Sequence, residues 1–573
     1  MLDFLIRNAQ IVDVYRLRTF AGWVGVTGGR FAYVDEGEPP SGLSATQRLD
    51  AGGAFLAPGL IDAHMHIESS LTTPRRFAEA VLPFGTTAVL ADPHEVANVA
   101  GVDGVRWMIA AARGLPLRVY IAIPSCVPAT GPDIEWTEPV FGAAEVAALA
   151  GEEAVIALGE VMDYMGLLGQ NDRLPGLVAA AREAGLLVEG HIPTLAGPEL
   201  SRYLAHGITS DHTLTTPEKL REQVSKGVAV MLQAKSITAE NIAAVNVLAD
   251  RAAILLVTDD IEPPLLQHGH LSTILASAIQ AGMPPLEAWA SATVRPARYL
   301  GLRDLGGIAP GRRADFLLLE RLDAFPPRAV YAAGAIVARE GAFTAGPLPE
   351  LPPLPAYPGV PGPLQPDDFC LDPTGAASAI VANAVTLDND RITLTRLEKL
   401  PLALQDGHPV FAPGDALDLA AVLARDGSSR AVGVVKNVHL ERGAFASSLA
   451  HDSHNLLVIG RDPVSLAAAA NAVHAMQGGV AVTQGEEVAA ALPLPLYGLL
   501  SDQPVGELAR DLAAVEDALR AVGMRHQRPF LMLSILALSV SPFYKFTDRG
   551  VVDTEARALL PAWVLPAWEE ARA

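Results

Sequence analysis

The segment "GLIDAHMHIESS", residues 59–70, decides which fold this sequence predicts. It begins as an apolar strand candidate after a Pro-Gly pair and then presents His64 and His66 one residue apart. Because side chains alternate across a β-strand, both imidazoles face the same side. Two imidazoles at this spacing can bind one metal ion, but an isolated His-x-His pair is as readily two ordinary strand histidines. The rest of the chain has to supply further ligands.

Strands and helices alternate regularly after this segment. Strand candidates lie at residues 86–93, 118–125, 155–161, 186–193, 208–213, 228–234 and 253–260. Alanine-rich helix candidates lie between them, for example residues 144–154 and 174–185. Such alternation over this length is what a (β/α)8 barrel requires. We therefore expect an α/β fold with a TIM-like barrel over residues 58–301.

Several of the later strand candidates end in residues that can bind metal. These residues are Glu160, His191, His212 and Asp259, the last followed by Asp260. In a barrel the carboxyl ends of the strands meet at one face, where catalytic residues lie. One polar strand end is readily a solvated loop. Four of them in strand order, after a His-x-His pair, indicate one shared metal site.

The chain outside the barrel is expected to form two more domains. Residues 1–57 and 302–345 carry short strands with glycine turns, so we expect one discontinuous small β domain, interrupted by the barrel. Residues 346–366 contain nine prolines and predict a stiff, extended linker. Residues 367–573 are expected to form a C-terminal α+β domain.

Composition excludes several classes of protein. The formal net charge of −22 disfavours nucleic acid as a partner, because phosphates would be repelled. The apolar run at residues 529–540 is shorter than the roughly 20 residues of a membrane-spanning helix, so no membrane partner is expected. The N-terminus has no secretory pattern, and two cysteines argue against a disulfide framework, so we expect a cytoplasmic protein.

The order His-x-His, Glu, His, His, Asp resembles the amidohydrolase superfamily of metal-dependent barrel hydrolases. Further segments are similar to the adenine deaminase family: "ADPHEVANV" (91–99), "ALGEVMDY" (157–164), "VTDDIEPPLLQHGHL" (257–271), "HDSHNLLVIG" (451–460) and "KFTDRGVVD" (545–553). This resemblance covers nearly the entire chain, including a C-terminal domain that most amidohydrolases lack.

The resemblance implies two divalent metal ions, Mn²⁺ or Fe²⁺, although histidine and carboxylate ligands also suit Zn²⁺. It implies the following ligands: His64 and His66 for the first ion, Glu160 as a bridge, His191 and His212 for the second ion, and Asp259 on a metal and the bridging hydroxide. The implied reaction is hydrolytic deamination of adenine to hypoxanthine and ammonia by that hydroxide.

The same resemblance implies further roles. Asp259 takes the proton of the hydroxide and passes it on, while Glu160 is a candidate to protonate the purine ring. His94 is a candidate catalytic or substrate-orienting group, and Glu95 a candidate contact to the purine. Read alone, residues 92–95 are as readily a proline turn with solvated charges. His270 is expected to cap a helix or to lie on the surface.

Two segments differ from the family pattern. Thr213 stands where an acid commonly follows the histidine, and residues 231–238 replace an Arg-Glu-Gly-Ser segment. The same metal chemistry on an N6-substituted adenine, another aminopurine or a cyclic amide is therefore the first alternative. A non-catalytic scaffold that binds small molecules is the second. The expected partners are a purine base and further copies of the chain, with a dimer as the simplest oligomer.

Overall fold

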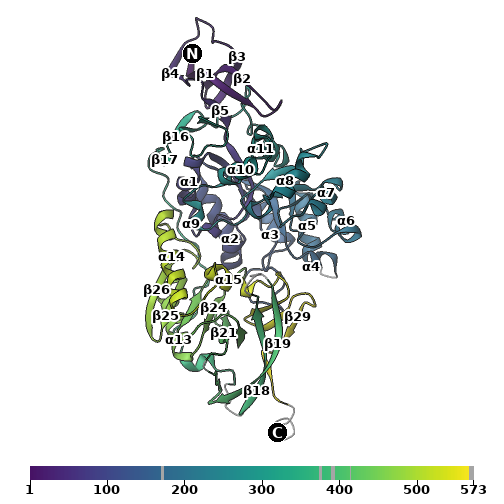
Figure 1. The fold of residues 1–573 in the computed structure, drawn as a ribbon, viewed down its shortest axis with the longest axis vertical. Helices are drawn as coiled ribbons and strands as arrows, with labels where there is room; N and C mark the ends of the chain where they lie inside the picture. The colour runs from purple at the N-terminus through teal and green to yellow at the C-terminus, as the bar shows by residue number, and fades with distance from the viewer. Residues whose placement is uncertain (170–172, 373–376, 389–393, 413, 567–573) are drawn as a thin grey trace. The chain divides into compact units, whose positions relative to one another are not determined.

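The computed structural model describes residues 1–573 except 170–172, 373–376, 389–393, 413 and 567–573 (Figure 1). The chain divides into two compact units. Unit 1 comprises residues 1–93, 106–124 and 142–352. Unit 2 comprises residues 94–105, 125–141 and 353–573. The domain boundaries expected from the sequence stay a prediction.

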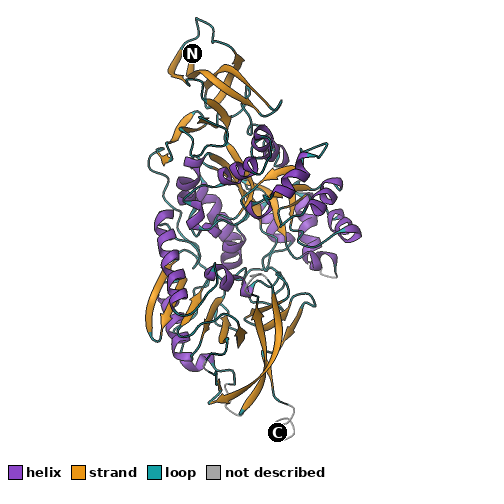
Figure 2. Ribbon diagram, viewed as in Figure 1, coloured by secondary structure: helices purple, strands orange, loops and turns teal. Residues whose placement is uncertain are grey.

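Unit 1 contains a mixed β-sheet built from residues on both sides of the barrel in sequence (Figure 2). Its strands are β1 (Leu2–Asp13), β2 (Arg18–Thr27), β3 (Arg30–Glu36), β4 (Ala45–Asp50), β5 (Phe55–Pro58), β14 (Phe316–Leu319), β15 (Ala329–Ala332), β16 (Ala335–Arg339) and β17 (Ala342–Phe343). β14 pairs antiparallel with β5, which joins the two parts. Gly28 and Gly29 turn the chain between β2 and β3 with φ of +57° and +72°, a conformation that glycine adopts without strain.

The second part of unit 1 is a barrel of parallel strands. In chain order they are β6 (Leu60–Met65), β7 (Thr86–Ala91), β8 (Arg118–Ile123), β9 (Val155–Val161), β10 (Leu187–Gly190), β11 (Ser210–Asp211), β12 (Ala229–Leu232) and β13 (Ile254–Leu256). β6 to β10 form one sheet and β11 to β13 form another. Backbone hydrogen bonds from Thr209 N to Val188 O and from Asp259 N to His64 O link the two sheets at both edges. The expected (β/α)8 fold class is confirmed.

Helices follow the barrel strands and cover them. They are α1 (Pro74–Val81), α2 (His94–Ala112), α3 (Ala143–Leu149), α4 (Tyr164–Leu168), α5 (Arg173–Glu183), α6 (Gly197–Ala205), α7 (Pro217–Ser225), α8 (Ala239–Asn246), α9 (Pro263–Leu266), α10 (Leu271–Gln280), α11 (Pro285–Ser291) and α12 (Val294–Tyr299), with the short 3-10 turns η1 (Glu68–Ser70), η2 (Leu82–Phe84) and η3 (Ala234–Ser236). Thr216 caps α7 by accepting a bond from Lys219 N, which satisfies a backbone donor that the helix itself leaves open. The helix α2 bends at Gly101, where φ is +59°.

Unit 2 is built on a second large β-sheet. Its strands are β18 (Ala379–Leu387), β19 (Thr395–Gln405), β20 (His408–Pro409), β21 (Leu417–Leu423), β22 (Arg430–Lys436), β23 (Ala444–Ser447), β24 (Leu456–Gly460), β25 (Gly479–Gln484), β26 (Glu487–Pro493) and β30 (Trp563–Val564). The helix α13 (Pro463–Ala475) packs its alanine-rich face on buried residues of this sheet, among them Ala446 and Val458. The expected C-terminal α+β domain is therefore confirmed.

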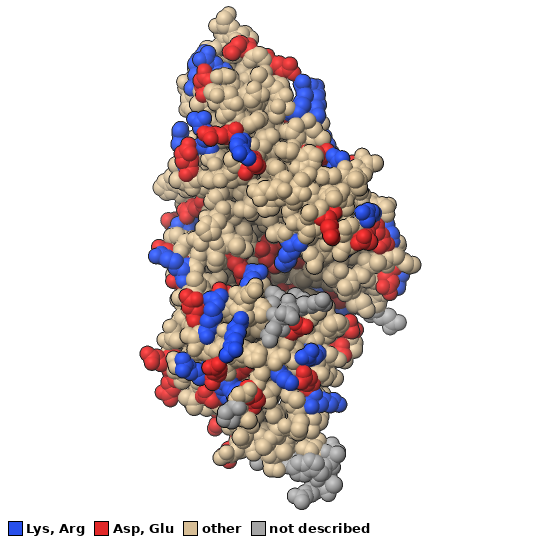
Figure 3. Space-filling model, in the orientation of Figure 1, with Lys and Arg blue, Asp and Glu red and all other residues tan. Residues whose placement is uncertain are grey.

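The remaining elements of unit 2 are η4 (Pro366–Phe369), α14 (Val505–Ala521), α15 (Pro529–Ser534), η5 (Ile535–Ala537) and a small sheet of β27 (Tyr544–Thr547), β28 (Gly550–Asp553) and β29 (Ala558–Leu560). Residues 346–365 contain neither helix nor strand, as their prolines require. Among the described helices, none has the length and apolar character needed to cross a bilayer. On the face drawn in Figure 3, acidic and basic side chains are interspersed.

Candidate metal centre

The barrel brings together all six ligands that the sequence predicts for the metal centre. His64 lies in β6, and Glu160 lies in β9. The other four follow a strand end by one to three residues: His66 after β6, His191 after β10, His212 after β11 and Asp259 after β13. All belong to unit 1. The side chain of His191 is 28% exposed and that of Asp259 13%, whereas the other four are almost fully buried.

Glu160 lies between two groups of imidazoles. Its Oε1 is 3.4 Å from His66 Nε2. Its Oε2 is 2.6 Å from His191 Nδ1 and 3.1 Å from His212 Nε2. One carboxylate oxygen thus faces each group of histidines, which is the arrangement that a carboxylate bridging two metal ions requires.

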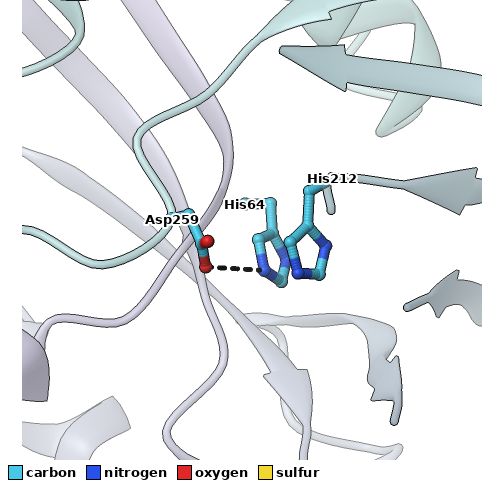
Figure 4. Close-up of side chains that lie close together, drawn as sticks. All are labelled: His64, His212 and Asp259. Carbon is cyan, nitrogen blue, oxygen red and sulfur yellow. Dashed lines mark ion pairs between the residues drawn. The ribbon is translucent and has the colours of Figure 1, made fainter. Parts of the chain in front are cut away.

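Asp259 faces His64 (Figure 4). Its Oδ1 is 3.8 Å from His64 Nε2 and 3.6 Å from His66 Nε2. The rings of His64 and His212 stack with their centroids 3.9 Å apart, so the two imidazoles approach Asp259 from one side in Figure 4. Asp259 has a φ of +62°, a region that residues other than glycine seldom occupy and that is enriched at functional sites.

The Nδ1 atoms of His64 and His66 are hydrogen-bonded to groups outside the six-residue cluster. His64 Nδ1 is 2.9 Å from Glu189 Oε2, and His66 Nδ1 is 3.0 Å from the carbonyl oxygen of Asp92. Partners of this kind set the ring orientation and direct Nε2 into the cluster. Glu189 is not among the residues that we predicted from the sequence. A signal was present, because Glu189 and His191 are two residues apart and adjoin the same strand end.

Gln233 is a second residue that the prediction missed. Its Nε2 donates to Asp259 Oδ2 at 2.8 Å and to the carbonyl oxygen of His212 at 3.0 Å. It lies in the segment 231–238 that differs from the family pattern. Thr213, the other difference, donates from Oγ1 to Asp211 and accepts a bond from Lys219 Nζ. The hydroxyl of Thr213 thus bonds to Asp211 and Lys219, whereas Gln233 contacts the cluster directly.

Burial and neighbouring charges shift the pKa values in the cluster. Burial lowers the pKa of His64 well below its usual value, and the nearby His212 lowers it further, which favours the neutral form that binds metal. Burial also acts to lower the pKa of His212, but Glu160 and Asp259 outweigh it and raise this pKa to about 9. Burial acts to raise the pKa of Glu160, yet His212 and His191 hold it well below its usual value. Metal binding therefore has to displace protons from the histidines.

The residues fit a pair of divalent ions. Three sets of ligand atoms lie within 4.8 Å of one another: His64, His212 and Asp259; His64, His66 and Glu160; Glu160, His191 and His212. His64 Nε2 is buried and has no hydrogen-bond partner among the described residues, as a nitrogen that binds metal requires. The cluster is composed of imidazole and carboxylate, ligands suited to first-row divalent ions.

His94 and Glu95 lie at the start of α2, in a segment that belongs to unit 2. His94 Nε2 is 3.7 Å from Asp452 Oδ1, and Glu95 Oε1 is 3.8 Å from His451 Nδ1. The structure thus groups both residues with the segment "HDSHN". Their expected roles towards the purine stay predictions.

His270 occupies the N-cap position of α10, as one of the two expectations had it, but its side chain makes no capping bond. The expectation of a surface position is wrong, because the residue is fully buried. Its ring nitrogens lie 3.0 Å from Thr86 Oγ1 and 3.2 Å from Thr258 Oγ1, and Asp62 is 3.5 Å away. His270 therefore links β6, β7 and the residues that follow β13. It supports the chain next to Asp259.

The parallel barrel and its strand-end histidines and carboxylates define a metal-dependent hydrolase of the amidohydrolase type. Residues 55–337 match the amidohydrolase family, whose members use divalent metal ions, and residues 392–558 match the adenine deaminase C-terminal domain.

Similarity to curated relatives shows which family within this class the chain belongs to. The chain is 37% identical to the adenine deaminase of Desulfatibacillum aliphaticivorans and 39% identical to that of Nitratidesulfovibrio vulgaris (strain Hildenborough), in each case over 96% of this chain and 95% of the relative. It is 36% identical to the adenine deaminase of Halalkalibacterium halodurans over 96% of this chain and 94% of the relative. The chain belongs to the adenine deaminase family, and it is a hydrolase that acts on C–N bonds.

Proposed function

We propose that this protein hydrolyses adenine to hypoxanthine and ammonia. The observation that carries the proposal is the position of Glu160 between two groups of histidines, each close enough to share an ion with it. The similarity to curated adenine deaminases over nearly the full length supports adenine as the substrate. In the reaction a C6–O bond forms, the C6–N bond breaks, and the amino group leaves as ammonia.

The metal centre in this proposal holds two divalent ions, Mn²⁺ or Fe²⁺, and its ligands also suit Zn²⁺. His64 and His66 would hold one ion, His191 and His212 would hold the other, and Glu160 would contribute its carboxylate to both. When bound, such a pair makes hydroxide available at neutral pH and fixes its position. Glu189 holds the ring of His64 with its Nε2 directed into the cluster.

Asp259 is the proposed proton carrier. It takes a proton from the attacking water and delivers it to the leaving amino group. Gln233 donates to Asp259 Oδ2, so this oxygen is held and Oδ1 is directed at His64 and His66. Gln233 therefore acts as a positioning residue through Asp259.

Glu160 is better suited to bridging than to protonating the purine ring. Both of its oxygens face imidazoles, and its pKa lies well below the usual value although burial acts to raise it. A group that donates a proton at neutral pH needs a higher pKa. His94 remains the proposed catalytic or orienting group.

Activity of the metal-loaded protein on a purine panel tests the proposal. The panel holds adenine, N6-methyladenine, 2,6-diaminopurine and a cyclic amide, and ammonia release is the readout. We expect adenine to give the highest kcat/KM. Preference for another member would assign the substrate to the first alternative and point to the altered segment that carries Gln233. Absence of turnover with every aminopurine would contradict the proposal and favour a non-catalytic scaffold.

We also propose a cytoplasmic location and a homo-oligomer, with a dimer as the simplest form. The scarcity of cysteine supports the location, because two cysteines in 573 residues suit a reducing compartment. Closed two-fold assemblies are the commonest oligomers among soluble enzymes. Light scattering of the purified protein tests the oligomeric state.

A further inference from the structure

Unit 2 contains a second cluster of histidines and carboxylates, outside the six-residue metal centre. Glu95 lies in the first turn of α2, and His451, Asp452 and His454 lie in the loop between β23 and β24. His451 Nδ1 is 3.8 Å from Glu95 Oε1 and 3.6 Å from Asp452 Oδ1. All four residues belong to the same unit.

The carboxylates of this cluster are deeply buried. Glu95 is 1% exposed and Asp452 3% exposed. Burial of a charged carboxylate is costly unless it is paired or binds a metal. The cluster offers two carboxylates and two imidazoles, so a divalent cation among them would balance the buried negative charge.

His454 is the residue that points most directly to a ligand. It is fully buried, and neither of its ring nitrogens has a hydrogen-bond partner among the described residues. Buried polar atoms in folded proteins usually have such a partner, so two buried ring nitrogens lacking one need an explanation. A neutral imidazole nitrogen is also one of the commonest metal ligands.

The backbone around His454 is held firmly. Its N–H donates to the carbonyl oxygen of Ala450 at 2.7 Å, and its own carbonyl oxygen accepts from Arg425 Nε at 2.6 Å. Asn455 accepts from Arg425 N and donates to the carbonyl oxygen of Trp136. The loop is thus anchored on both sides, and it presents His451 and His454 in a preorganised geometry.

The spacing of the donor atoms fits one ion. One ligand atom each from Glu95, His451 and His454 can be chosen so that all three lie within 4.8 Å of one another. Two atoms that each lie about 2.1 Å from one tetrahedral ion are about 3.4 Å apart, so a small inward movement completes the site. Two imidazoles and one carboxylate form a ligand set used for divalent zinc and iron.

We propose that Glu95, His451 and His454 bind one divalent transition-metal ion, separate from the pair in the barrel. Asp452 lies beside His451 and adds negative charge next to the site. The ion would join the start of α2 to the loop before β24, two segments 356 residues apart in the sequence (451 minus 95). This role for Glu95 differs from its predicted purine contact.

The competing explanation is an ion-pair network with no metal, in which a protonated His451 neutralises the two carboxylates. Both explanations satisfy the distances, but they differ in metal content. The protein is therefore stripped with a chelator, loaded separately with Zn²⁺ and Mn²⁺, freed of excess ion and analysed for metal per folded chain.

We expect about three ions in the wild-type protein with at least one of the two metals, and about two in His454→Gln. The matched control His526→Gln replaces a half-exposed histidine of the same unit and should keep the wild-type number. The double variant His64→Asn/His66→Asn damages the barrel centre and should still hold the ion of unit 2. Circular dichroism checks that each variant is folded.

Two ions in the wild-type protein with both metals, or an unchanged number in His454→Gln, would overturn the proposal. If His454→Gln does not fold, anomalous diffraction from metal-loaded wild-type crystals decides, because a site requires a peak bonded to His451 and His454. A missing third ion together with normal deamination would refute this inference alone. A third ion without any deamination would instead refute the proposed function alone.

Discussion

The two histidine–carboxylate clusters of this molecule are assembled in different ways. The barrel cluster takes ligands from five strands, and these ligands are spread over residues 64–259. The cluster of unit 2 takes Glu95 from the start of a helix and its other members from a single loop, residues 451–454. A barrel places each strand end at the same face, so its cluster is set by the register of the whole fold. The second cluster depends on one anchored loop.

The clusters also differ in how their imidazole rings are held in place. In the barrel, Glu189 and the carbonyl oxygen of Asp92 hold the outer nitrogens of His64 and His66. In unit 2 the backbone of His454 is anchored, but its ring nitrogens have no such partners among the described residues. Ring orientation is therefore preset by hydrogen bonds to the rings in one cluster and by the anchored backbone in the other.

Among the variants of the barrel cluster, Glu160→Gln is expected to lower activity most. The amide cannot bridge two ions with two anionic oxygens, so both groups of histidines lose their shared partner. We expect kcat to fall by about 10³-fold or more, because the nucleophile is no longer positioned or activated. Steady-state ammonia release measures this effect. Near-normal turnover in a folded, metal-loaded variant would show that Glu160 does not bridge.

Asp259→Asn tests the proton carrier separately from the bridge. The amide keeps the shape of the side chain but cannot accept the proton, so we expect kcat to fall by about 10² to 10⁴-fold. The total metal content should fall by less than in Glu160→Gln, because His64, His66 and Glu160 remain. A variant with unchanged kcat would assign the proton transfer to another group.

Glu189→Gln tests how much the hydrogen bond to His64 Nδ1 contributes to the barrel cluster. The residue contacts Nδ1 of His64 and so sets the orientation of that ring, and we expect a loss of about 10 to 100-fold in metal affinity or activity. A metal titration followed by activity separates the two effects. Activity that is restored at high metal concentration would mark a positioning role. The matched variant Glu183→Gln replaces an acid at the end of α5 and should behave like the wild type.

The smallest expected effect concerns a buried charge in unit 2. Burial lowers the pKa of Lys545, in β27 of unit 2, to about 7. The unfolded chain then binds more protons than the folded one between about pH 7 and 10.5. The free energy of unfolding should therefore rise with pH in this window, by at most about 1.4 kcal/mol per pH unit.

Lys545→Met should flatten this slope, and denaturant unfolding at several pH values measures it. The matched variant Lys399→Met replaces an exposed lysine of the same unit and should keep the wild-type slope. An unchanged slope in Lys545→Met would show that Lys545 keeps an ordinary pKa in the folded protein.

The histidine–carboxylate cluster of the barrel was predictable, because a barrel brings successive strand ends together at one face. Glu160, His191, His212 and Asp259 each stand at or just after the end of an apolar run, and parallel strands place such ends together. Glu189 was not among the predicted residues, although its spacing to His191 offered the same signal. Gln233 offered no such signal, because a glutamine after an apolar run carries no sign of its partner until the chain is folded.

The sequence by itself determined the alternation of strands and helices, the barrel class and the polar strand ends, since these depend on local periodicity. Only the tertiary structure decided that His270 is buried, that Gln233 holds Asp259, and that Glu95 meets His451. Such contacts join residues far apart in the sequence, and no local pattern records their distance. The pair in "GLIDAHMHIESS" lies between these cases: its spacing predicts a shared face, and the folded barrel supplies the partners that complete the proposed metal centre.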